Sequence, residues 1–345
     1  MPYVFGEQSI QEFQVTDNPY NAAYGGAGAG FVNTVTKSGT DMWHGNAFYY
    51  NRNSGVGNAN DAIDKANGVS RPLDVLQQFG ADLGGPIVHN KAWFYFDYEQ
   101  QRRKQPISVL NSEFGVLNDP NNLSTNFGVP NGTALPSSDA PYPVPGSFST
   151  PPLPSDPNFS AYLQQVSNAL GAIDRNLVQR ARRADNLSFF PKVDWQASAN
   201  DHMTFVYNYS RFNSPGGEIT FNPVATFGAE ALSNNFVRDH HVSAHWTHSF
   251  SSSFLNDASL GYLRDQQLET PSGIAPATLG QIEFFSPTFF ELGNPTFSQG
   301  NNQESQWEIN DHVTYITGRH TLNFGFDFNR THVSDFFPGN FDGTY

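Results

Sequence analysis

The stretch of sequence that decides the fold is Thr321-Leu322-Asn323-Phe324-Gly325-Phe326-Asp327-Phe328-Asn329-Arg330-Thr331. Its even positions up to Phe328 are apolar, and its odd positions are polar or glycine. Side chains in a strand point to opposite faces with a period of two residues. The stretch therefore predicts a β-strand with one apolar face and one polar face.

Eight further stretches have strand character, and most show the same alternation. In one of them Phe79, Ala81 and Leu83 share a face, whereas the stretch 43–52 carries aromatic residues at both parities. Most of the strands have the roughly 10 residues that a tilted strand needs to cross the hydrocarbon layer of a membrane. The stretches are 43–52, 77–83, 91–103, 185–197, 202–212, 236–250, 254–265 and 305–317.

The connections between these strands alternate between short and long. Tight turns are expected at 85–90, 197–201, 251–253 and Gly318, and long polar loops at 53–75, 104–184, 213–235 and 266–302. A soluble β-sandwich could use the same strands but would not explain this rhythm. Short turns at one end and long loops at the other are typical of an outer-membrane β-barrel.

The composition agrees with an all-β membrane protein. Only 14% of the 345 residues are charged, against about 25% in soluble proteins. No run of about 20 apolar residues offers a transmembrane helix. The net charge of -14 disfavours nucleic acid as a partner, and the absence of cysteine excludes disulfides, thiolate metal sites and a cysteine nucleophile.

The long connection 104–184 has two parts of different character. Its first half is rich in proline, serine and asparagine, which prevents regular strand pairing. In the second half, residues 161–183 place Leu163, Val166, Leu170, Ile173 and Leu177 at helical spacing. Arginines gather toward the end of this expected helix, where they could bind a ligand or anionic lipopolysaccharide; they are Arg175, Arg180, Arg182 and Arg183.

Three groups of residues resemble chemical sites, but each has a simpler explanation. The glycine-rich stretch 25–30 fits no phosphate-binding spacing. On a strand, His241 and His245 would lie about 13 Å apart, too far to share a metal ion. Asp97 and Glu99 share a face about 7 Å apart without any companion site. We therefore predict no catalytic, cofactor-binding or metal-binding residues.

Aromatic residues near the strand ends are expected to form the girdles of a barrel at the membrane interfaces. The candidates are Trp43, Tyr49, Tyr50, Trp93, Trp246, Trp307 and Tyr315.

Several of these stretches resemble a known family, the TonB-dependent outer-membrane receptors, and within it the Oar-like branch. Residues 9–15 (Ser-Ile-Gln-Glu-Phe-Gln-Val), 21–25 and 32–40 are similar to the end of the family's plug domain. Residues 44–48, 78–87 and 91–99 resemble its first barrel strands, and 190–195 with 318–325 resemble later ones.

The resemblance implies a domain organisation and a function. Residues 1–41 would be the C-terminal part of a plug domain, and 42–345 the N-terminal part of a barrel, an open antiparallel sheet of about nine strands with the extracellular loop 104–184. The chain would be a fragment without signal peptide, TonB box or early plug. It would belong to a nutrient transporter rather than an enzyme, located in the outer membrane among lipid and lipopolysaccharide. A TonB-type energy-transducing complex would act through the missing N-terminal region.

Other functions stay open at this point. A surface adhesion or secretion-related protein would have the same architecture, and a soluble carbohydrate-binding sandwich is a weaker alternative. Aromatic residues in the loops favour a glycan or peptide-like nutrient over a ferric chelate. They are Phe221, Phe227, Phe284, Phe285, Phe289 and Phe290.

Overall fold

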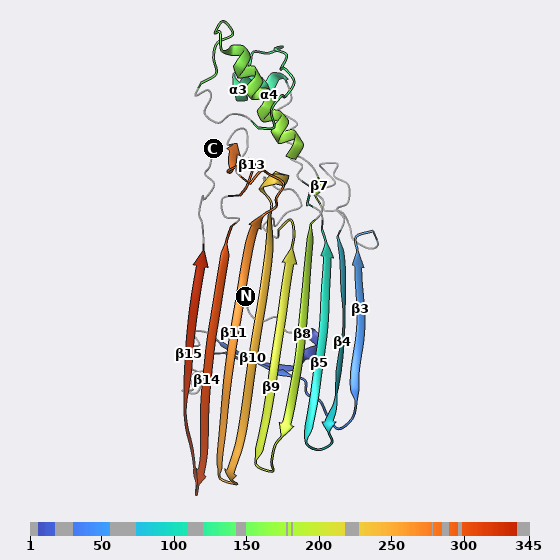
Figure 1. Ribbon diagram of the computed structural model, residues 1–345, viewed down its shortest axis with the longest axis vertical. Helices are drawn as coiled ribbons and strands as arrows, with labels where there is room; N and C mark the ends of the chain where they lie inside the picture. The colour runs from blue at the N-terminus through green and yellow to red at the C-terminus, as the bar shows by residue number, and fades with distance from the viewer. Residues whose placement is uncertain are drawn as a thin grey trace.

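The computed structural model describes residues 6–17, 30–55, 74–105, 107–108, 120–142, 150–176, 179–180, 182–217, 228–277, 279–284, 290–295 and 299–336. Nine strands form one antiparallel sheet in the order β15-β14-β11-β10-β9-β8-β5-β4-β3. Figure 1 shows this sheet as a single layer of long strands, with short turns at the lower end and long connections at the upper end. The sheet is open, and β3 and β15 are its two edges within the described residues.

All nine expected strands are confirmed, and the structure extends most of them at the loop end. A sandwich is excluded for the described residues, because the other sheets have only two strands each. The long strands are β3 (His44–Asn53), β4 (Val75–Val88), β5 (Ala92–Lys104), β8 (Arg183–Gln196), β9 (Asp201–Ser214), β10 (Ser233–Ser251), β11 (Phe254–Pro271), β14 (Asn301–Thr317) and β15 (His320–Phe336).

The turn after β4 is shorter than the sequence suggested. Gly85 and Pro86 lie inside β4, and the turn comprises only residues 89–91, with Asn90 at a φ of 57°. The pairing with β5 shifts between Pro86 and Val88. Such an irregularity allows a strand to contain a proline, which cannot donate a ladder hydrogen bond.

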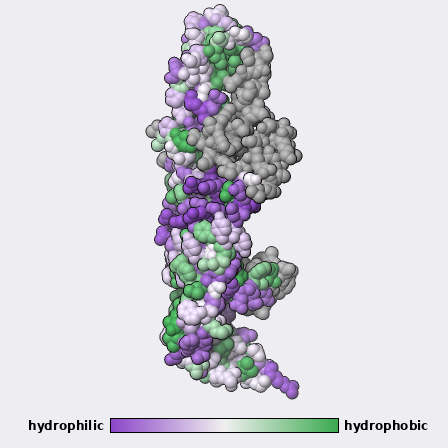
Figure 2. Space-filling view, turned by 90° about the vertical axis from the view of Figure 1, so that its right-hand side faces the viewer, coloured by the Kyte–Doolittle hydropathy of each residue, from purple (hydrophilic) through white to green (hydrophobic). Residues whose placement is uncertain are grey.

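The two faces of the sheet differ in character. Cross-strand pairing places Phe328, Ile309, Leu260 and Ala244 in one row, and paired residues of an antiparallel sheet share a face. We call this apolar side the outer face and the opposite side the inner face. Figure 2 shows hydrophobic patches on the lower part of the strand stack and a hydrophilic band above them.

Charged side chains are also divided between the faces. Carboxylates gather on the inner face, and six of them are buried: Asp82, Asp97, Glu99, Asp194, Asp239 and Asp265. Five arginines of the long strands lie on the outer face: Arg102, Arg211, Arg238, Arg264 and Arg330. Arg52 and Arg103, at the loop end, lie on the inner face. Asp311 is an outward-facing carboxylate, and it accepts a hydrogen bond from Asn256 of the neighbouring strand.

The N-terminal residues form a small hairpin of their own. A 3-10 turn, η1 (Glu7–Ser9), leads into β1 (Ile10–Asp17), which pairs with β2 (Gly30–Thr36) in a two-stranded antiparallel sheet. The glycine run at 25–29 lies outside the described residues. Figure 1 shows the hairpin behind the lower half of the long strands, crossing them at an angle.

The upper connections contain a compact helical unit, which the sequence predicted only in part. Helix α4 (Phe159–Asn176) confirms the expected helix but ends earlier, and α3 (Pro120–Phe127) lies in the half where no regular structure was expected. Short elements complete the upper region: η2 (Ala229–Ala231), the pair β12 (Ile282–Phe284) and β13 (Phe290–Leu292), and the pair β6 (Ile107–Ser108) and β7 (Gln179–Arg180).

The prediction of a basic helix over 161–183 was therefore wrong at its C-terminal end. Only Arg175 lies in the last turn of α4. Arg183 instead pairs with Lys104 as the first residue of β8, and Arg182 accepts a backbone hydrogen bond from Gln105. The pairing of β8 with β5 removes these arginines from helical geometry.

A separate hydrophobic core holds the upper unit together. It joins the helices of one connection to β12 and β13 of another, which places residues far apart in sequence side by side. The buried members are Leu123, Val129, Tyr162, Val166, Leu170, Ala172, Ile173, Ile282 and Leu292. Within the described residues, no helix is long and apolar enough to span a membrane.

Candidate functional site

The inner face of β3, β4, β5 and β8 holds the start of the chain. The backbone amide of Gln8 donates to the Glu99 carboxylate over 2.6 Å, and the Tyr95 hydroxyl donates to the Gln8 carbonyl over 2.8 Å. The Gln8 side-chain oxygen also accepts from Asn46 at 3.4 Å. One residue of η1 is therefore bound by strands β3 and β5 together.

Two lysines connect the end of β2 with the same wall. The Lys37 ammonium lies 3.9 Å from the Asp82 carboxylate. The Lys192 ammonium donates to the carbonyl and the hydroxyl of Thr36 over 3.4 and 3.2 Å, and it lies 4.0 Å from Asp194. A hydrogen bond to a charged group has a net value of roughly 1.5–3 kcal/mol, and a partly exposed ion pair one of about 0–1 kcal/mol. The hairpin is thus attached by several weak polar contacts rather than by an apolar core.

Gly6 covers the buried carboxylate of Asp97. Asp97 is 0% exposed, and neither of its carboxylate oxygens has a hydrogen-bond partner within the described residues. A Cβ atom on Gly6 would overlap the Asp97 carboxylate and lie 2.9 Å from Glu99. The backbone can approach these acids this closely only because residue 6 has no side chain.

Asp41 fixes the chain where it enters the first long strand. Its carboxylate accepts hydrogen bonds from the Asn90 amide at 2.8 Å and from the Trp93 indole at 2.9 Å. The Asn90 bond first, and then the Trp93 bond, hold the pKa of Asp41 below its usual value. Trp93 consequently lies on the inner side at the turn end, so its expected place in an outward girdle was wrong.

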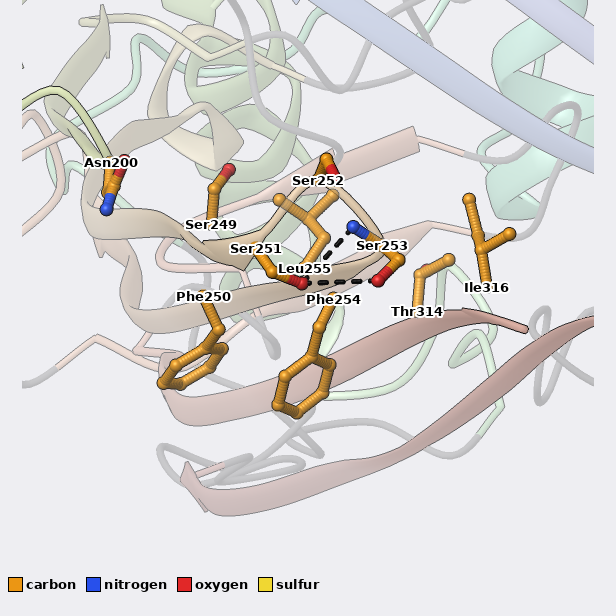
Figure 3. A pocket seen from close by; sticks show the side chains of 10 residues that line it. All are labelled: Asn200, Ser249, Phe250, Ser251, Ser252, Ser253, Phe254, Leu255, Thr314 and Ile316. Carbon is orange, nitrogen blue, oxygen red and sulfur yellow. Dashed lines mark hydrogen bonds between the residues drawn. The ribbon is translucent and has the colours of Figure 1, made fainter. Parts of the chain in front are cut away.

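Five other expected girdle residues are exposed: Trp43, Tyr49, Trp246, Trp307 and Tyr315. Tyr50 is exposed as well, but it pairs with Gln78 and lies on the inner face, so its expected place in the girdle was also wrong. Around the β10–β11 turn, Phe250 and Phe254 stack at 4.8 Å, and Phe254 meets Tyr315 edge-on at 6.0 Å. Figure 3 shows a shallow pocket of about 400 Å³ here, lined by these phenylalanines and by turn serines. Its rings extend the aromatic belt at the end of the sheet that has short turns.

At the loop end of β3, β4 and β5, Asp74 joins two arginines. Its carboxylate lies 3.0 Å from both Arg52 and Arg103. Burial opposes ionisation of Asp74, but the two guanidinium groups outweigh it and lower the pKa. This cluster ties the first strands together just below the upper unit.

Asn176 joins the upper connections to one another. Its amide nitrogen donates to the Ala172 carbonyl at 3.0 Å, and its oxygen accepts from the Glu230 amide at 2.9 Å. The Tyr142 hydroxyl donates to the Glu230 carboxylate over 2.9 Å; burial and this carboxylate raise the pKa of Tyr142 to about 12. The Gly228 amide donates to the Glu291 carbonyl at 2.7 Å. Burial and, secondarily, Glu283 raise the pKa of Glu291 to about 7.

The histidines of β10 whose contacts are described have different partners, and His245 is one of the two considered in the sequence. His245 contacts Asp257 at 2.8 Å, His248 contacts Asp201 at 2.6 Å, and His240 contacts the Tyr207 hydroxyl at 2.8 Å. In the described part of the chain, no three metal-ligating side chains come together. That these histidines do not share a metal ion stays a prediction.

Comparison with known proteins identifies the architecture. A family model described as an outer membrane beta barrel domain matches residues 35–345. The chain belongs to this outer-membrane β-barrel family. Membership places the protein in the cell outer membrane, and its fold and relatives are those of transporters and receptors.

Individual relatives of this β-barrel chain are distant and longer. The TonB-dependent transporter Oar of Myxococcus xanthus is 29% identical over 107 residues, which are 30% of this chain and 10% of Oar. The outer membrane transporter YddB of Escherichia coli matches with a TM-score of 0.58 and 7% identity, over 94% of this chain and 35% of YddB. The siderophore receptor PirA of Acinetobacter baumannii matches with a TM-score of 0.50 and 12% identity, over the same shares. This chain therefore spans about a third or less of each of these proteins.

Sequence reasoning missed part of the wall that binds the hairpin. Asp97 and Glu99 were correctly placed on one face, but their association with Gly6 and Gln8 was not foreseen. The contacts of Asp41 were also missed. The only local signal was the presence of acids at alternate positions of a strand next to aromatic residues, and such a pattern does not specify a partner about 90 residues away in sequence, as Gln8 is from Glu99.

Proposed function

We propose that this chain is the plug-facing part of a TonB-dependent transporter that takes up a nutrient across the outer membrane. Residues 1–41 would be the C-terminal part of the plug, and 42–345 the first part of the barrel. A TonB-type complex would act through a region of the protein that precedes this chain. The protein would have no catalytic residues, and its inner and outer faces would serve passage and membrane anchoring.

The observation that carries this proposal is the attachment of residues 6–9 and 36–37 to the inner wall. A plug that must move needs contacts that hold it in the resting state and yet can be broken. The bonds of Gln8 to Glu99 and Tyr95, and of Lys37 to Asp82, are polar and individually weak. Such an attachment can be released a few bonds at a time.

The substrate we propose is a glycan or a peptide-like nutrient rather than a ferric chelate. Buried carboxylates line the inner face, and they would repel anionic chelates. The loop aromatics give limited support, because Phe221, Phe227, Phe285 and Phe289 lie outside the described residues. Phe284 and Phe290 pair opposite each other in β12 and β13.

Cross-linking can test whether the hairpin must move. The chain has no cysteine, so Gln8→Cys and Asn46→Cys introduce the only thiols of this sequence. Their native side chains meet at 3.4 Å, and a short, reducible bis-methanethiosulfonate reagent can bridge the thiols. In cells that express the whole receptor, we expect the bridge to abolish uptake and reductant to restore it.

A matched pair of cysteines within the barrel controls for the chemistry. Thr314 and Asn323 are cross-strand partners of β14 and β15, far from the hairpin. Bridging Thr314→Cys to Asn323→Cys should leave uptake intact. Full uptake by the bridged Gln8–Asn46 receptor would contradict a moving plug.

Growth tests distinguish the substrate classes and the competing function. A strain that lacks the whole gene should grow poorly on defined glycan or peptide sources and normally under iron limitation. A defect confined to iron limitation would overturn the substrate proposal. Normal growth on every source, with loss of surface attachment or secretion, would favour an adhesion or secretion-related protein of the same architecture.

A further inference from the structure

The outward arginines follow the upper border of the apolar wall. Arg330 shares a cross-strand row with Trp307. On the same face, Arg264 lies in the next row toward the loops, two residues beyond Tyr262. Arg238 and Arg211 lie together in the row after that. Strands of a barrel are tilted relative to the membrane normal. Residues at one depth in the membrane therefore belong to a different cross-strand row on each strand. The arginines of β15, β11, β10 and β9 therefore lie at a similar depth, toward the loop end of the apolar wall.

Two of these arginines are placed against each other. Arg238 and Arg211 are direct cross-strand partners on the outer face. Arg264 is the diagonal neighbour of Arg238 across the β10–β11 pair. Like charges directly opposite each other destabilise a sheet. Among the described residues, none of these three guanidinium groups takes part in a salt bridge, and the nearest outward carboxylate, that of Asp185, is only a diagonal neighbour of Arg211 across the β8–β9 pair.

We propose that Arg211, Arg238 and Arg264 form a binding site for the phosphate groups of the glycolipid in the outer leaflet of the outer membrane. A guanidinium group binds phosphate through two parallel hydrogen bonds, and a doubly charged phosphate offsets the repulsion between neighbouring arginines. The apolar wall beneath would accept the acyl chains. We call these three residues the arginine cluster.

The position of the cluster identifies the lipid leaflet. Long loops of outer-membrane barrels face the exterior, and the cluster lies on the loop side of the apolar wall. The aromatic rings of Tyr209 and His240 lie 4.9 Å apart beside it, and tyrosine is enriched at membrane interfaces. Slightly nearer the loops, a pocket of about 370 Å³ is lined by Arg183, Leu232, Asn234 and Ile274, among others. This pocket can take part of a sugar headgroup.

The test uses the whole receptor, extracted in mild detergent and freed of bound lipid. Lipid A with both phosphates is titrated against the parent protein and against Arg211→Gln/Arg238→Gln, with binding followed by native mass spectrometry. We expect the double variant to bind at least about tenfold more weakly, since each charged hydrogen bond lost is worth about a factor of ten. Lipid A without phosphates should bind the parent as weakly as the intact lipid binds the variant.

Controls distinguish this site from general charge effects and from misfolding. Arg175→Gln removes an arginine of α4 and should leave lipid binding unchanged. Arg238→Lys keeps the charge and should retain most of the binding, even if the double variant fails to fold as judged by heat-dependent migration of the barrel in gels. Equal binding of phosphorylated and dephosphorylated lipid A would overturn the proposal. Competition by inorganic phosphate alone, without a contribution from the acyl chains, would overturn the assignment to a lipid.

Discussion

The backbone amide of Gln8 lies 2.6 Å from the carboxylate of Glu99, although the two residues are 91 positions apart. This bond ties the first described turn of the chain to the middle of the barrel wall. A carboxylate that accepts a backbone N–H in a partly buried site makes a stronger bond than a neutral acceptor. The attachment of the hairpin therefore depends on the surroundings of Glu99, in particular on Gly6.

Replacing Gly6 by valine should detach the hairpin. The new side chain would overlap the Asp97 carboxylate and displace Gln8 from Glu99 and Tyr95. Loss of these contacts should weaken the docking by about 2–4 kcal/mol. Hydrogen exchange at the amides of Gln8 and Lys37 measures this directly. Gly261→Ala is the control, because the nearest atom to its Cβ would be 3.6 Å away. Unchanged exchange in Gly6→Val would show that the hairpin does not depend on the close approach.

Arginine should be tolerated on the inner face of β15 and not on its outer face. Phe326 is 56% exposed on the outer face, where we expect lipid. Phe326→Arg should cost about 2–4 kcal/mol if the residue lies near the bilayer centre. Asn323→Arg should cost no more than about 1 kcal/mol, since it removes one hydrogen bond, from Thr314. Urea unfolding of the receptor in lipid vesicles compares the two variants, and equal costs would contradict the assignment of faces.

Removal of the Asn176 side chain should loosen the upper unit without affecting the barrel. Asn176 is 2% exposed and bonded to both Ala172 and Glu230. Asn176→Ala would leave the Glu230 amide without its acceptor, at a cost of about 1–3 kcal/mol. We expect faster hydrogen exchange in α4 and residues 228–231, and unchanged exchange in β8 to β11. Faster exchange throughout the sheet would mean that the unit and the barrel unfold together.

Protonation of Glu291 should stabilise the upper unit. Its pKa of about 7 exceeds the ordinary value of 4.5 because of burial and the neighbouring Glu283. Between these two pH values the folded state binds more protons than the unfolded state, so the stability of the unit falls as the pH rises from 4.5 through 7. Hydrogen exchange at β12 and β13 should accelerate over this range, after correction for the intrinsic pH dependence of exchange.

Glu291→Gln offers the matched test of that pH dependence. Glutamine cannot ionise, so the corrected exchange rates of the variant should stay constant between pH 5 and pH 8, a range chosen to bracket the pKa of about 7. A variant with the same acceleration as the parent would assign the effect to another group.

The sequence predicted the sheet more completely than the sites. Alternation in β15 and in the strands around Phe79 and Phe189 follows directly from the two environments of a barrel wall, so each strand could be recognised alone. The helix α3 and the end of α4 could not be recognised in this way. Their boundaries depend on packing against β12 and β13. They also depend on the pairing of Arg183 with Lys104, which places Arg183 in a strand rather than in the helix. The contacts of Gly6 and Asp41 arise only when distant segments meet.

The division of charge between the two faces has a consequence for how the sheet assembles. A slip of one residue in the pairing of any two strands turns every side chain of one strand to the other face. In β10 such a slip would exchange Arg238 for Asp239, moving a carboxylate toward hydrocarbon and a guanidinium among acids. The free-energy cost of such a slip is larger than in a strand whose polar residues are uncharged. The same pattern that sorts charges in the folded wall therefore disfavours misaligned strands while the barrel is still forming.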